Sequence, residues 1–199
     1  MPKPYTPNDK WSQRAAAEGF RARSVYKLME LDERFHLLKP GITVVDLGSA
    51  PGSWLQYAAM QIEPGGKIIG LDLTPIEPVA DSVHIFQQDI TKIDEVKKLL
   101  NNQGSETVDL VLADLAPSTS GIKDVDQWRS IELNQAAAAL ATDILKQGGK
   151  CVLKVFRGAD FDEFLAGLKL LWVDVRIVSV EASRDRSREV YLVMKKKKV

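Results

Sequence analysis

The sequence predicts an α/β fold with a mostly parallel, seven-stranded sheet that ends in an antiparallel hairpin and carries helices on both faces. Two observations predict it. Short apolar segments alternate with helical patterns along most of the chain, which is typical of parallel strands joined by helices. The last two strand patterns have no helix between them and must pair as a hairpin. At 199 residues the chain suits a single domain, 1–199.

Each element follows from the pattern of apolar residues. Five segments are apolar nearly throughout, as in strands buried on both faces: 42–46, 67–72, 83–87, 108–114 and 150–156. Helical patterns fall between or before them: 21–37, 53–62, 91–102, 127–146 and 160–170. Segments 173–182 and 189–194, joined by SRDRSR, make the hairpin.

Composition limits the class of protein. Hydrophobic residues make up 45% and charged residues 27%, and no apolar run approaches the roughly 20 residues of a membrane span. The single cysteine, Cys151, allows no internal disulfide and no multi-cysteine zinc site. The first residues contain no apolar signal region. We therefore expect a cytoplasmic monomer that binds neither membrane nor metal.

The formal net charge is zero, but the charges are segregated. Basic residues gather in the N-terminal segment 1–20 and just beyond it, and again in Arg184, Arg186, Arg188 and the tail 195–199. If the two termini meet on one face, they form a surface suited to an RNA backbone. The alternative for the four tail lysines is that they are merely solvated.

The stretch VVDLGSAPGSW, residues 44–54, predicts a buried strand, a tight glycine loop and a helix start. A phosphate-binding P-loop needs a Gly-Lys pair, and this loop ends in Gly52 and Ser53. A dinucleotide fingerprint needs a second glycine where Ala50 stands. Asp46, two residues before Gly48, favours a ligand with an amino group or positive charge. S-adenosylmethionine is such a ligand.

Acidic residues stand at four successive strand ends: Asp46, Asp72, Asp89 and Asp114. Ligands of open α/β sheets bind at this edge. Asp72 is placed for ribose hydroxyls and Asp89 for the adenine edge, while Asp46 and Asp114 flank the amino-acid end and the sulfonium. Any one of them alone is explained as a turn or cap residue. A parallel sheet ending in a hairpin is also the layout of Rossmann-like methyltransferases.

The residues after the fourth strand limit which atom, nitrogen, carbon or oxygen, can accept the methyl group. Asp114-Leu115-Ala116-Pro117 lacks the second proline and the aromatic ring of base-amino methylases, and Cys151 lies mid-strand, where a structural cysteine is expected. Oxygen remains, and a hydroxyl needs a base. A lysine has an ordinary pKa of about 10.4, which desolvation and nearby positive charge lower. Lys154, in the apolar run VLKVF, is the candidate base, although a strand-end lysine can simply reach into solvent.

These segments together resemble the FtsJ family of ribose 2′-O-methyltransferases. The resemblance rests on RSVYKL (23–28), DLGSAPGSW (46–54), DLAP followed by SG (114–121), LKVFRG (153–158) and SREVYLV (187–193), which cover nearly the whole chain in the same order. Ser53 departs from the glycine that is usual after Pro-Gly in the bacterial ribosomal enzymes, and the basic N-terminal segment is shorter than theirs.

The resemblance implies a function and a site. It implies a catalytic tetrad of Lys27, Asp114, Lys154 and Glu189, with Lys154 as proton acceptor. The implied contacts of S-adenosylmethionine are Gly52, Trp54, Asp72, Asp89 and Asp114, to which the loop pattern itself adds Asp46 and Gly48. The implied substrate is a uridine ribose of large-subunit (23S) ribosomal RNA, in ribosome biogenesis. The alternatives are the anticodon loop of transfer RNA, and an RNA-binding ribosome assembly factor without catalysis.

Overall fold

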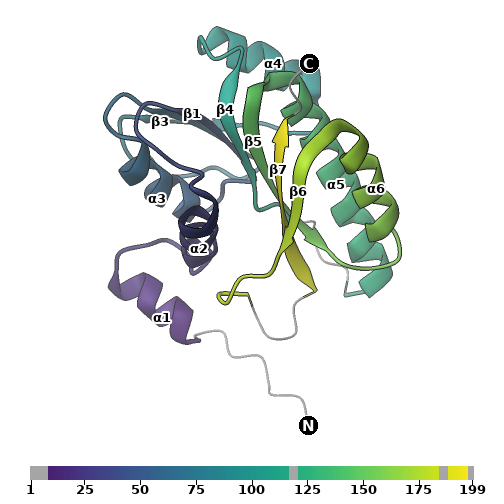
Figure 1. Ribbon diagram of the computed structural model, residues 1–199. Coiled ribbons are helices and arrows are strands. Elements are labelled where there is room, and N and C mark those ends of the chain that lie inside the picture. The colour runs from purple at the N-terminus through teal and green to yellow at the C-terminus, as the bar shows by residue number, and fades with distance from the viewer. Residues whose placement is uncertain (1–8, 117–120, 184–187, 197–199) are drawn as a thin grey trace.

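The computed structural model describes residues 9–116, 121–183 and 188–196. The strands in this part of the chain are β1 (Thr43–Leu47), β2 (Lys67–Asp72), β3 (Val83–Gln87), β4 (Val108–Ala113), β5 (Leu145–Phe156), β6 (Trp172–Val178) and β7 (Glu189–Lys196). They form one seven-stranded sheet in the order β3-β2-β1-β4-β5-β7-β6 (Figure 1). Strands β1 to β5 run parallel, and β7 lies antiparallel between β5 and β6. The predicted sheet, including its antiparallel hairpin, is confirmed.

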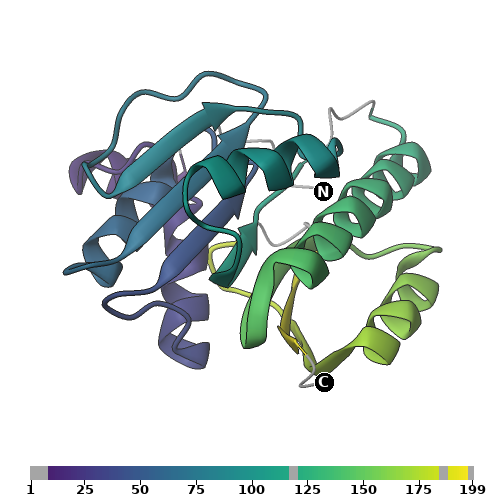
Figure 2. The same cartoon turned by 90° about the horizontal axis from the view of Figure 1, so that it is seen from above.

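Helices cover both faces of this sheet, as predicted. They are α1 (Lys10–Ala17), α2 (Val25–Phe35), α3 (Ser53–Ile62), α4 (Ile93–Asn102), α5 (Lys123–Ile144) and α6 (Phe161–Leu171). One core cluster joins the sheet to α4, α5 and α6, and a second joins its other face to α2 and α3 (Figure 2). Val44 and Val45 are both fully buried, in different clusters. Because successive strand residues face opposite sides, a sheet covered twice needs apolar residues at every position.

Several element bounds differ from those predicted. Helix α1 was not predicted, because segment 1–20 was interpreted by its charge alone; its N-cap is Asp9, whose carboxylate accepts the Ser12 N–H at 3.0 Å. Helix α5 begins earlier than 127, at Lys123, and β5 follows it directly at Leu145. Strand β6 stops at Val178, not at 182.

The strand order places a binding edge between β1 and β4. The chain runs outward from β1 through β2 to β3, and then returns to β4 on the other side of β1. Ligands of open α/β sheets bind at such a reversal, beyond the carboxyl ends of the strands. Among the described residues, no helix is long and apolar enough to cross a bilayer, and no group of three or more His, Cys, Asp or Glu residues is arranged to hold a metal ion.

Candidate active site

The glycine loop after β1 is shaped by two close approaches. Gly48 has φ 74°, and a Cβ there would lie 2.6 Å from the Leu115 side chain. Gly52 has φ 102°, and a Cβ there would lie 2.7 Å from the Arg21 guanidinium. Both conformations disfavour any residue with a side chain. The Gly48 N–H also donates to the Leu71 carbonyl at 2.8 Å, which folds the loop back onto the end of β2.

Asp46 is the most unusual residue of this edge. It is 1% exposed, and neither carboxylate oxygen has a hydrogen-bond partner among the described residues. Burial, and then the charges of Asp114 and Asp72, raise its pKa well above the ordinary value. The nearby Ser49 hydroxyl is also buried without a partner. A buried carboxylate with unused acceptors fits a ligand that brings an ammonium group or another positive charge.

Asp72 and Asp89, unlike Asp46, accept hydrogen bonds from nearby residues. Asp72 accepts the Ala50 N–H at 2.9 Å and the Thr74 N–H at 2.7 Å, so its carboxylate links β2 to the glycine loop. Asp89 follows β3 and accepts both the hydroxyl and the N–H of Thr91, and these hydrogen bonds lower its pKa. Both carboxylates lie at the carboxyl edge of the sheet, where a nucleoside would bind.

Trp54 packs at the contact between α3 and the start of α2. Its side chain is 3% exposed, and its indole N–H donates to the Ser24 carbonyl at 2.8 Å. Its ring lies 6.2 Å from that of Tyr191, centroid to centroid. A hydrogen bond between the hydroxyls of Ser24 and Ser53, 2.9 Å long, supports the same junction. Trp54 therefore fixes the start of α3, and a cofactor contact by Trp54 stays a prediction.

The four residues of the predicted tetrad come from four elements and form two ion pairs. Lys154 on β5 lies 3.1 Å from the Asp114 carboxylate, just beyond β4, and donates to the Asp114 carbonyl at 2.9 Å. Lys27 on α2 lies 2.6 Å from the Glu189 carboxylate at the start of β7. Lys154 is buried, 5% exposed. The structure thus gives each lysine a carboxylate partner.

Tyr191, which sequence reasoning missed, joins the two pairs. Its hydroxyl donates to Asp114 at 2.8 Å, and the Lys27 ammonium lies 5.9 Å from its ring centroid. Burial, and then the Asp114 charge, raise its pKa well above the ordinary value, so Tyr191 stays a donor. A signal for it existed in the sequence, because Tyr191 stands two residues after Glu189 and shares its side of β7.

Two further supporting contacts carry no local signal in the sequence. The Ser183 hydroxyl donates to Glu189 at 2.5 Å, from the loop between β6 and β7. The Asn134 side chain, fully buried on α5, donates to the Lys154 carbonyl at 2.8 Å and fixes that part of β5. Cys151 is fully buried, and burial raises its thiol pKa, which confirms its interpretation as a structural residue.

Arg21, counted in the sequence among the basic residues for RNA, instead braces the cofactor loop. Its guanidinium donates to the Pro51 carbonyl at 3.1 Å, the Glu77 carbonyl at 2.8 Å and the Pro78 carbonyl at 2.7 Å. It therefore ties the glycine loop to the segment after β2. The close approach at Gly52 leaves room for this guanidinium.

The described residues of the basic tail, Lys195 and Lys196, lie away from the N-terminal basic residues. Glu189, at the start of β7, pairs with Phe156 at the carboxyl end of β5, whereas Lys195 pairs with Lys150, six residues earlier on that strand. The prediction of one joint basic surface is therefore wrong for Lys195 and for Lys196, whose ammonium donates to the Leu145 carbonyl at 2.6 Å. Helix α1 and the end of β7 lie at opposite ends of the molecule (Figure 1). Arg184, Arg186 and residues 197–199 lie outside the described part.

The fold, the glycine loop with its buried Asp46, and the paired lysines define a Rossmann-like methyltransferase. Comparison with known sequences gives the family. The sequence profile of the FtsJ-like methyltransferases matches residues 20–197, so the chain belongs to that family. Its family implies a methyl donor of the S-adenosylmethionine type.

Similar proteins agree with this assignment. The chain is 46% identical over 186 residues to the ribosomal RNA large subunit methyltransferase E of Azoarcus sp. (strain BH72), covering 94% of this chain and 90% of that protein. It is 43% identical to the protein of that name from Thiobacillus denitrificans, covering 93% and 84%. A crystal structure from Plasmodium falciparum, assigned as a ribosomal RNA methyltransferase, superposes with a TM-score of 0.79 at 30% identity, covering 89% of this chain and 98% of that one.

Proposed function

We propose that this protein transfers a methyl group from S-adenosylmethionine to a ribose 2′-hydroxyl of large-subunit ribosomal RNA. The names of the relatives support ribosomal RNA as the substrate. The chemistry rests mainly on one observation: two largely shielded lysine–carboxylate pairs lie at the sheet edge, with Tyr191 between them, its hydroxyl on Asp114 and its ring beside Lys27. A hydroxyl acceptor requires a base, and Lys154 is the basic group closest to Asp114.

The residues present fit S-adenosylmethionine. The unpartnered carboxylate of Asp46 suits its amino group, Asp72 the ribose hydroxyls and Asp89 the adenine edge. The positive φ angles of Gly48 and Gly52 give the loop the shape that places it beside these groups. When bound, this donor supplies an electrophilic methyl group on a sulfonium. Ligand binding would satisfy a buried acceptor that the protein leaves open.

In this proposal the tetrad positions the hydroxyl and removes its proton. The Lys154 amine would accept the proton of the 2′-hydroxyl, and the bound donor would supply the methyl group to the hydroxyl oxygen. Asp114 fixes the Lys154 side chain through two contacts. The pair of Lys27 and Glu189 orients the ribose from the other side. The rate then comes from positioning and fixed charges.

The RNA would approach from the side of α1 and α2. Helix α1 carries exposed Lys10 and Arg14. Arg14 also forms an ion pair with Glu18 on the same helix. Arg23, which is half-buried, forms an ion pair with Asp9 and donates to the Ala182 carbonyl, so it holds α1 in place. We further propose that the protein acts as a monomer in the cytoplasm.

The test is the position of the transferred label. The protein is incubated with methyl-labelled S-adenosylmethionine and with three substrates in parallel: protein-free 23S RNA, large ribosomal subunits and transfer RNA. A methylated ribose leaves an alkali-resistant dinucleotide. We expect this product from 23S RNA or from the subunit. Label on a base refutes ribose methylation, label on transfer RNA alone refutes the ribosomal substrate, and no incorporation in any sample favours an assembly factor.

A further inference from the structure

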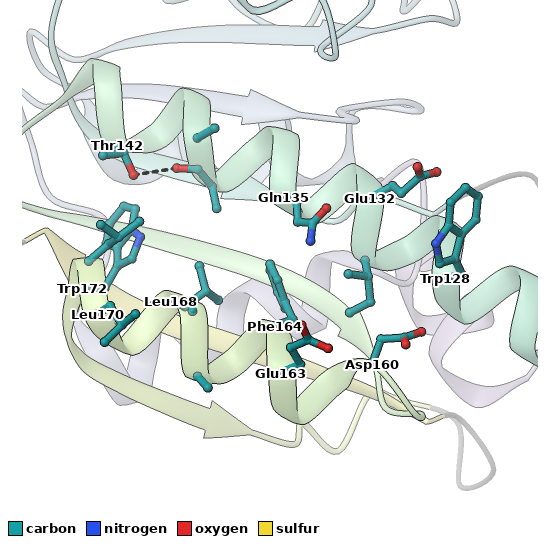
Figure 3. Close-up of a pocket in the computed structure, with 16 residues that line it drawn as sticks. Trp128, Glu132, Gln135, Thr142, Asp160, Glu163, Phe164, Leu168, Leu170 and Trp172 are labelled. Atoms are coloured by element: carbon teal, nitrogen blue, oxygen red, sulfur yellow. Dashed lines mark hydrogen bonds between the residues drawn. The ribbon is translucent and has the colours of Figure 1, made fainter.

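A large groove lies between α5 and α6, on the face of the sheet away from α2 and α3. Its volume is about 800 Å³, and residues of both helices line it (Figure 3). Leu170, Leu171 and Trp128 have exposed fractions of 75%, 58% and 52%, which is high for large apolar side chains. Exposed apolar side chains along one groove of this size favour an interaction site. None of its lining residues belongs to the tetrad or the cofactor loop.

The groove carries charge of one sign only. The ionisable residues in its lining are Glu132, Asp160 and Glu163, all carboxylates. Figure 3 shows Glu132 and Asp160 at the same end as the Trp128 ring, while Trp172 and Leu170 lie at the other end. A carboxylate beside an exposed indole is a favourable setting for an arginine or lysine, through ion pairing and cation–π contact. RNA and anionic lipid surfaces are repelled by the same carboxylates.

The groove has the dimensions of a helix site. It follows α5 from Trp128 to Thr142, which is roughly 20 Å at the helical rise, or about four turns. Small residues, Ala138 on α5 and Gly167 on α6, line its middle and permit close approach of a third helix. A second copy of this chain is a poor occupant, because two grooves with the same negative rim repel each other.

We propose that this groove docks a basic, amphipathic helix of a partner protein. The apolar side of that helix would lie on Leu170, Leu171 and the small residues between α5 and α6. Its arginines or lysines would lie at the Trp128 end, against Glu132, Asp160 and Glu163. An isolated helix of this length is marginal in water, so the partner segment would gain helicity on binding. This site is independent of the methyl-transfer reaction.

The test uses a defined peptide and the full chain. The probe is a fluorescent peptide of about five turns, with leucines at helical spacing and arginines on the flanking positions. The control peptide has glutamates in place of the arginines. Binding is measured by fluorescence anisotropy. We expect the arginine peptide to bind at least tenfold more tightly than the glutamate peptide, with an affinity that falls as salt rises.

Variants locate the binding. A Cβ at Gly167 meets nothing within 4 Å, so Gly167→Phe fills the groove without disturbing the core, and Gly167→Ala is its matched control. We expect Gly167→Phe to weaken binding of the arginine peptide at least tenfold and Gly167→Ala to change the affinity less than twofold. If Gly167→Phe does not fold, the double variant Glu132→Gln, Glu163→Gln serves as the test. We expect it to bind the arginine peptide several-fold more weakly than wild type, with an affinity that depends less on salt.

Other results would overturn the proposal. Equal binding of both peptides, or arginine-peptide binding that all the variants retain, excludes a basic helix from this groove. Loss of RNA binding in Gly167→Phe assigns the groove to RNA. Concentration-dependent dimers that Gly167→Phe abolishes assign it to a second copy of the chain.

Discussion

Replacing Asp46 by asparagine should stabilise the protein without ligand and weaken its hold on the methyl donor. The carboxylate is buried and has no hydrogen-bond partner among the described residues. Asparagine has nearly the same shape and cannot ionise, so without leaving a cavity the variant removes a buried carboxyl group that must either hold a proton or carry an unpaired charge. Stability and binding should therefore change in opposite directions, which a purely structural role for Asp46 does not predict.

The size follows from the extra cost of burying an ionisable group in place of a neutral amide, which we take as about 1–3 kcal/mol because unsatisfied charged groups cost more than neutral ones. For a chain of this length, 1 kcal/mol shifts the unfolding midpoint by about 2–4 °C. Asp46→Asn should therefore raise the midpoint of the ligand-free protein by about 2–12 °C. Excess donor, at a hundred times its dissociation constant, stabilises by about 2.7 kcal/mol, and the variant should lose most of this gain.

The pH dependence has a definite sign. Burial, with the charges of Asp114 and Asp72, raises the Asp46 pKa, so the folded chain keeps a proton that the unfolded chain has released. Wild-type stability should then fall as pH rises from the ordinary carboxyl range through the raised pKa, and this component should vanish in Asp46→Asn. Thermal melts by circular dichroism at a series of pH values, with and without S-adenosylmethionine, measure both effects. A ligand-free variant less stable than wild type at neutral pH would refute the reasoning.

Three further changes probe other contacts. Arg21→Lys should raise the dissociation constant of S-adenosylmethionine roughly tenfold at nearly unchanged kcat, since lysine cannot keep all the hydrogen bonds to the glycine loop and to the segment after β2. Calorimetry measures the affinity, with the exposed Arg34→Lys as control. A lower kcat at unchanged affinity would contradict this prediction. Tyr191→Phe should slow methyl transfer about 2–10-fold, because Asp114 retains its ion pair with Lys154 but loses the hydrogen bond from the Tyr191 hydroxyl. Unchanged single-turnover rates would show that this hydroxyl has no part in the reaction. Lys10→Gln with Arg14→Gln should reduce the slope of log affinity for RNA against log salt by about 2; an unaltered slope would place the RNA elsewhere.

The fold was predictable because its periodicity is strong. Apolar runs mark the parallel strands, and the absence of a helix between 182 and 189 marks the antiparallel pair. Charge alone was misleading at the N-terminus, where Asp9 and an alanine-rich stretch make a helix. The start of β5 at 145 was missed because the end of α5 passes into β5 with no loop between them.

The pairing of Lys27 with Glu189 and of Lys154 with Asp114 agrees with the tetrad that the resemblance implies, whereas the contacts that support these residues required the structure. Tyr191 stands in an apolar strand, and only the pairing of β5 with β7 brings its hydroxyl to Asp114. Arg21 lies thirty residues or more from the carbonyls that it holds, so no local pattern reports it. Ser183 reaches Glu189 across the connection between β6 and β7. Contacts of this kind depend on chain topology and not on spacing.

The most direct test of the central claim compares Lys154→Ala with Lys98→Ala, an exposed lysine on α4, in single-turnover methyl transfer to large-subunit RNA. If Lys154 takes the hydroxyl proton, its loss should slow transfer by roughly 10²–10⁴-fold, as for removal of a general base, with S-adenosylmethionine affinity within about twofold of wild type. Lys98→Ala should match wild type. A Lys154→Ala rate within a few-fold of wild type would contradict the mechanism.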